Sequence, residues 1–150
     1  MGLYNINICI YNSMRNNIMK GKTDWKKNNK VSLRNFHESC DFHDLVKTQV
    51  LRMLRREHKD NHNVPIYTEY DPENPNDDYP DIWMRIKKSI IVYEIQKDTS
   101  KKWTKQIVEK YKDCDLIIVP LKEVKKEWMK ELNKKDPMYS LRNVLNKYIV

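Results

Sequence analysis

Two carboxylates, Asp81 and Glu94, stand where a predicted β-hairpin would bring them together. Residues 81–86 and 90–96 have the composition of two strands, joined by a tight turn. In this hairpin the numbers of facing residues sum to 175, so Asp81 lies opposite Glu94, with Cβ atoms roughly 5 Å apart. Two like charges this close repel each other, and a divalent cation between them is the simplest remedy. Hard oxygen ligands favour Mg²⁺ or Mn²⁺.

Gln96 follows Glu94 by two positions, so alternation along a strand places both side chains on one face. A neutral amide takes no proton at pH 7 and cannot act as a general base, but it could orient a metal-activated water. Alternatively, Gln96 indicates an active site that has lost its catalytic activity. For Glu94, which interrupts an apolar strand, the alternative is a salt bridge to Arg85 or Lys97.

The dipeptide Pro80-Asp81, a short hairpin and then Glu94-Ile95-Gln96 resemble the PD-(D/E)XK nuclease superfamily, which includes restriction endonucleases and archaeal Holliday-junction resolvases. The chain departs from the family pattern at Gln96, where lysine is usual, and Glu-x-Gln variants occur in the family. The resemblance implies that Asp81 and Glu94 hold Mg²⁺ or Mn²⁺, with the backbone carbonyl of Ile95 as a further ligand. It also implies hydrolysis of phosphodiester bonds in DNA.

The resemblance covers about residues 36–133 and implies a further acid on the first helix. Glu38 lies one turn before Phe42 on the same helical stripe, which makes it a candidate metal ligand, and Asp41 is its competitor. The alternative role for Glu38 is a favourable first-turn charge at a helix N-terminus.

The elements that must position these groups follow from hydrophobic periodicity. An amphipathic helix is predicted at 36–58, and the crossover helix before the fourth strand permits parallel pairing with the third. The expected fold class is α/β, with an αβββαβ core, a mixed central sheet and C-terminal helices, and the resemblance implies that this core is restriction-endonuclease-like. The other predicted elements are a strand at 64–70, the hairpin, a helix capped by Asp98 or Thr99 and running to about Asp113, a strand at 114–121 covered on both faces, a helix at 123–133 with Val124, Trp128, Met129 and Leu132 inward, and a helix at 138–148.

Charge is distributed unevenly along the 150 residues. Residues 1–35, rich in Asn and Lys, carry a net charge of +6 and are expected to be a mobile segment before a nuclease-like domain at 36–150. Residues 36–84 carry −6 and residues 85–135 carry +7. Basic segments around an acidic centre are what a nucleic-acid enzyme needs, because cations hold the backbone while carboxylates hold the metal. The alternative is a solvated surface with a basic tail.

Lys101, Lys102 and Lys105 lie on or beside the predicted helix after Gln96. We expect them to contact DNA phosphates, which positions a strand without reading its bases. The alternative is a solubilising helix face.

The absence of an apolar run of about 18 residues or a signal pattern predicts a cytoplasmic protein without a membrane segment, in the host cytoplasm if the source is viral. Three widely spaced cysteines (Cys9, Cys40, Cys114) fit reduced thiols. The lack of alanine points to an AT-rich genome, which suits a virus or plasmid, and no Gly-rich phosphate loop can form after Gly21.

Together these features predict a Mg²⁺- or Mn²⁺-dependent deoxyribonuclease, an endonuclease, that acts on DNA. The alternatives are a non-catalytic DNA-binding protein that retains the nuclease fold and a basic packaging or scaffold protein, for which the acidic centre is an awkward fit. Whether a homodimer forms stays open.

Overall fold

The computed structural model describes residues 42–61, 63–74, 79–97 and 99–150. The elements in chain order are α3 (Phe42–Glu57), β1 (Ile66–Thr68), β2 (Ile82–Ile86), β3 (Ser89–Gln96), α4 (Lys101–Lys110), β4 (Asp115–Pro120), α5 (Leu121–Lys130), α6 (Pro137–Leu145) and a 3₁₀ helix (Asn146–Tyr148). The described chain is therefore a mixed α/β protein in which the elements follow one another in the predicted order. The segment 1–35 lies outside the described residues.

The four strands form one mixed sheet in the order β1-β2-β3-β4. The β1–β2 and β2–β3 pairs are antiparallel and the β3–β4 pair is parallel, which confirms the predicted parallel pairing. The hairpin runs from the pair Ile82–Tyr93 to the pair Ile86–Ser89, and this is the predicted register. Lys87, the first residue of the two-residue turn, has φ 56°, as the mirror-image turns of tight hairpins require.

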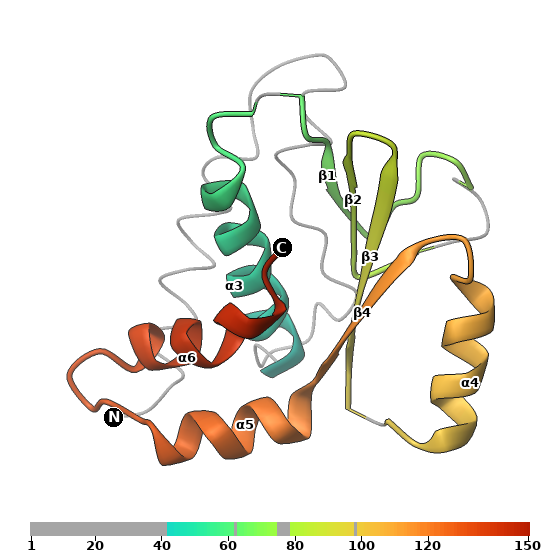
Figure 1. The fold of residues 1–150 in the computed structure, drawn as a ribbon. Helices are drawn as coiled ribbons and strands as arrows, with labels where there is room; N and C mark the ends of the chain where they lie inside the picture. The colour runs from blue at the N-terminus through green and yellow to red at the C-terminus, as the bar shows by residue number, and fades with distance from the viewer. Residues whose placement is uncertain (1–41, 62, 75–78, 98) are drawn as a thin grey trace.

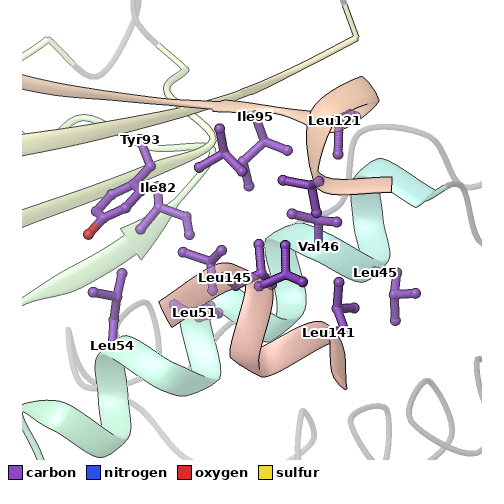
Figure 2. Packing of buried hydrophobic residues seen from close by; sticks show 14 of the residues in the cluster. Leu45, Val46, Leu51, Leu54, Ile82, Tyr93, Ile95, Leu121, Leu141 and Leu145 are labelled. Carbon is purple, nitrogen blue, oxygen red and sulfur yellow. The ribbon is translucent and has the colours of Figure 1, made fainter. Parts of the chain in front are cut away.

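The main core lies between one face of the sheet and helices α3, α5 and α6 (Figures 1 and 2). Apolar residues of α3 recur at helical spacing, so Val46, Val50 and Leu54 are buried against that face. The strands contribute the alternate residues Ile82 and Ile95. Burying each such side chain contributes about 1.5–3 kcal/mol, so this face supplies most of the apolar stabilisation.

A smaller cluster covers the other face, on which α4 lies (Figure 1). It consists of Trp83, Val92 and Tyr111, with half-buried neighbours packed around them. No residue within α4 itself is buried. The expectation that residues 114–121 are covered on both faces is wrong, because β4 is an edge strand and most of its residues are only half-buried.

Several element boundaries differ from the predicted ones, those of α4 and α5 among them. The cap of α4 is Ser100, whose Oγ accepts the N–H of Trp103 at 3.4 Å, and the helix ends at Lys110. Helix α5 begins at Leu121, directly after β4.

Met129 was expected to point inward but is 56% exposed. Val124 and Trp128, one turn apart, define the buried face of α5. Met129 is turned about 100° from Trp128 around the helix axis, because one turn takes 3.6 residues. Among the described residues, no helix is long and apolar enough to cross a membrane.

Candidate functional site

Asp81 lies immediately before β2 and is almost completely buried, with 1% of its surface exposed. Its Oδ2 accepts the backbone N–H of Ile95 at 2.7 Å. The carboxylate therefore takes the place that the next backbone carbonyl of the β2–β3 ladder would occupy. The β2–β3 register ends at the pair Ile82–Tyr93, one position before the predicted pair Asp81–Glu94, and the negative charge of Asp81 acts on Glu94.

Two cationic side chains from α3 face the second oxygen of Asp81. Nε2 of His43 lies 3.1 Å from Asp81 Oδ1, and Nζ of Lys47 lies 3.7 Å from the same atom. His43 and Lys47 are four residues apart, so they project from one side of the helix. Although both groups come close, Oδ1 lacks a well-aligned hydrogen bond within the described part of the chain. A lone pair on this oxygen therefore remains available.

Lys47 is completely buried, with 0% exposure, and also forms an ion pair with Glu69. Glu69 follows β1 in a left-handed conformation with φ 51°, and its N–H donates to the carbonyl of Pro80 at 3.0 Å. A non-glycine residue pays about 1–2 kcal/mol for this conformation. That cost is offset here because Glu69 pairs with Lys47, and the buried ammonium of Lys47 without a carboxylate partner would cost more.

These contacts determine the protonation of Asp81 and His43. Burial raises the pKa of Asp81, but the hydrogen bond and charge of His43, the charge of Lys47 and the N–H of Ile95 together lower it below its usual range. Burial lowers the pKa of His43, but hydrogen bonds to Asp44 and Asp81 outweigh this and raise the pKa to about 9. Asp81 is thus held as an anion beside a cationic imidazolium.

Glu94 has a different environment. It is 4% exposed on the α4 face, where Tyr111 Oη donates to Oε1 at 2.9 Å and Gln96 Nε2 donates to Oε2 at 3.1 Å. Burial and the nearby charge of Asp81 raise the pKa of Glu94, and the two hydrogen bonds and the charge of Lys110 lower it by less. The two facing carboxylates therefore have pKa values shifted in opposite directions.

The structure agrees with some of the other predictions for site residues and not with others. Gln96 lies beside Glu94, as strand alternation predicts. The alternative salt bridge from Arg85 to Glu94 is not formed, because the Arg85 guanidinium pairs with Glu73. Glu38 and its competitor Asp41 lie outside the described residues.

Lys101, Lys102 and Lys105 are all exposed on the first turns of α4. Their exposure is compatible both with contacts to phosphates and with a solubilising helix face.

Sequence reasoning missed two groups of this site on α3 and one on α4. Lys47 sits within the apolar stripe, at helical spacing from Val50, Leu51 and Leu54, and a lysine in that pattern was the available signal. His43 precedes it by one turn. The ring of Tyr111 packs in the small cluster, and local spacing does not indicate that its hydroxyl contacts Glu94.

The residues present fit a hard divalent cation in part. Within the described ranges, no group of three or more His, Cys, Asp or Glu side chains comes together as a metal site. Of the predicted ligands, Glu38 lies outside the described residues, and the others are two such side chains, Asp81 and Glu94, and the backbone carbonyl of Ile95. In a strand the N–H and C=O of one residue point to the same side. Because the Ile95 N–H points at Asp81, the Ile95 carbonyl also lies on the side of β3 that faces Asp81.

Comparison of the chain with protein-family models, with curated proteins and with solved structures gives no match. The candidate site is therefore argued from the contacts of this chain alone.

Proposed function

We propose that this chain is a Mg²⁺- or Mn²⁺-dependent DNA nuclease with a restriction-endonuclease-like core. The observation that supports this most is the buried pair Asp81 and Glu94, which are both under 5% exposed and close enough for the charge of Asp81 to raise the pKa of Glu94. Buried carboxylates side by side are costly unless a cation stabilises them.

The charge balance around the pair leaves room for such a cation. The cluster contains the carboxylates of Asp44, Glu69, Asp81 and Glu94, against the cations His43 and Lys47. Both cations act on the Asp81 side. The hydrogen-bond donors to Glu94, by contrast, are a phenol and an amide, which carry no charge. A divalent ion near Glu94 would balance the remaining negative charge.

In this proposal Asp81 Oδ1, the Glu94 carboxylate and the Ile95 carbonyl hold the ion. When bound, the ion lowers the pKa of a water molecule and offsets negative charge on the phosphate. Asp81 stays ionised because His43 and Lys47 lower its pKa. Gln96 donates an N–H to Glu94 and keeps its amide oxygen as an acceptor for a water molecule.

Helix α4 is the proposed site of DNA backbone contact. Its exposed Lys101, Lys102 and Lys105 would neutralise phosphates, which is the sequence-independent part of DNA binding. Tyr111, the C-cap of the same helix, contacts Glu94, so α4 lies beside one of the two carboxylates.

A second candidate function is non-catalytic DNA binding by a protein that keeps the nuclease fold. One observation favours it: Gln96 replaces the lysine that is usual in the family, and its amide donates to Glu94. Such a protein would retain the lysines of α4 while binding metal poorly.

The test is cleavage of duplex, single-stranded, flap and four-way DNA with and without Mn²⁺. Asp81→Asn and Glu94→Gln should each reduce cleavage roughly 10³-fold, the upper end for one electrostatic group, and leave DNA binding intact. Asp71→Asn is the matched control, because Asp71 is a buried carboxylate that accepts the N–H of Glu73 instead. Cleavage at the parental rate by either site variant would remove the proposed site.

A further inference from the structure

Tyr111 connects helix α4 to the centre of the sheet. It caps the C-terminus of α4, is 3% exposed and packs with Trp83 and Val92. Half-buried Ile107 of α4 packs against the same cluster, and Tyr111 is its fully buried residue next to the helix. At the same time its hydroxyl donates to Glu94 Oε1 at 2.9 Å in a buried position.

The hydroxyl and the ring of Tyr111 have separable roles. The ring fills volume in the small cluster, and phenylalanine would do this equally well. The hydroxyl takes one oxygen of Glu94 while Gln96 takes the other, so the two donors together fix the plane of the carboxylate. Each carboxylate oxygen has two lone pairs, so one on each oxygen stays available after these bonds are formed.

Resting on the proposed function, we propose that Tyr111 is a positioning residue of the metal site. Its O–H holds the Glu94 carboxylate in the orientation in which it shares a cation with Asp81. Without the hydroxyl, a glutamate with three rotatable bonds would need to be ordered by the cation itself. Residues that hold a metal-ligating side chain in place typically contribute 10–100-fold to metal affinity.

The experiment compares Tyr111→Phe with Tyr93→Phe in the full chain. Tyr93 is the matched control, because it neighbours Glu94 in β3, is buried, and donates its hydroxyl to the Tyr148 carbonyl at 2.9 Å on the other face. Mn²⁺ affinity is measured by calorimetry without DNA. We expect about tenfold weaker binding for Tyr111→Phe. Tyr93→Phe should bind Mn²⁺ as the parental chain does, and saturating Mn²⁺ should restore cleavage by Tyr111→Phe.

A double-mutant cycle of Tyr111→Phe with Glu94→Met, which removes the acceptor oxygens of Glu94, supplies a thermal-unfolding readout that is independent of metal. A direct hydrogen bond makes the two effects non-additive. Additive effects, or parental Mn²⁺ affinity in Tyr111→Phe, would overturn the positioning role while the proposed function stands. A parental chain that binds no Mn²⁺ would overturn the proposed function and the positioning role together, and a non-additive cycle would then identify a purely structural hydrogen bond.

Discussion

Two neighbouring carboxylates are surrounded by different groups, one by side chains of α3 and the other by side chains beside α4. On the α3 side, Asp81 meets the cations His43 and Lys47, and its pKa falls below the usual range. On the α4 side, Glu94 meets Tyr111 and Gln96, and its pKa rises. The two carboxylates thus differ because Asp81 contacts two cations, whereas the hydrogen-bond donors of Glu94 are neutral and the nearby charge of Asp81 raises its pKa.

The faces also differ in how firmly they are packed. The α3 face carries the main core, whereas the α4 face has a small cluster and a helix without buried residues of its own. We infer that the α3 side fixes the fold and one permanent anion. The α4 side supplies the carboxylate whose charge depends most on an added cation.

The largest effect should come from the charged face. Lys47→Met leaves the buried carboxylates of Glu69 and Asp81 without the ammonium between them, so we expect a loss of about 3–5 kcal/mol in urea unfolding. Adding Glu69→Gln should recover part of it. Lys125→Met, an exposed lysine on α5, is the control and should change stability by less than ~0.5 kcal/mol. Equal stability of Lys47→Met and the parental chain would contradict the contrast between the faces.

On the neutral face, Gln96→Ala should reduce cleavage about 10²-fold, the lower end for a positioned proton-handling group. Mn²⁺ affinity should change less than in Tyr111→Phe, because Gln96 is half-buried and its bond to Glu94 is longer. Gln96→Lys should stay active or gain activity. A parental chain with no cleavage, restored by Gln96→Lys, would instead identify a retired nuclease and favour the DNA-binding alternative.

The contrast also predicts a pH dependence of stability. The folded pKa of His43, about 9, lies above the ordinary 6.5, so its contribution is complete below pH 6.5 and is lost as the pH rises through 9. We expect the free energy of unfolding to fall by ~2 kcal/mol across that window, since a tenfold difference in proton affinity corresponds to about 1.4 kcal/mol and solvent screens part of the effect. Chemical denaturation of His43→Gln at pH 6 and pH 9.5 should show a flatter profile. If the free energy of unfolding of His43→Gln fell with pH as steeply as that of the parental chain, the assigned role of His43 would be wrong.

The smallest effect concerns the exposed lysines of α4. Replacing Lys101, Lys102 and Lys105 with alanine should flatten the plot of log DNA affinity against log salt by about 1 for each phosphate that a lysine no longer neutralises. The matched triple variant carries the same charge change on α5, at Lys122, Lys125 and Lys126. If both triple variants flatten the slope equally, α4 is not the specific DNA contact.

Local patterns were sufficient to predict the order of the elements and the hairpin register. Alternation over β2 and β3 and a two-residue turn leave one pairing that keeps Ile82 and Tyr93 on the core face. Gln96 was placed beside Glu94 for the same reason, because a strand has a period of two. The predicted inward position of Met129 is wrong. The same apolar residues can face the core at more than one rotation of the helix about its axis, so the sequence pattern does not fix which of them are buried.

Local sequence patterns therefore predict the α/β succession, the neighbouring carboxylates Asp81 and Glu94, and the neutral amide of Gln96 beside Glu94. Only the tertiary structure decided which groups surround each carboxylate. Lys47 reaches Asp81 from 34 positions away and Tyr111 reaches Glu94 from 17, through the packing of α3 and α4 on opposite faces. No local period encodes such encounters, because they depend on how whole elements dock and on which polar groups must find partners once buried.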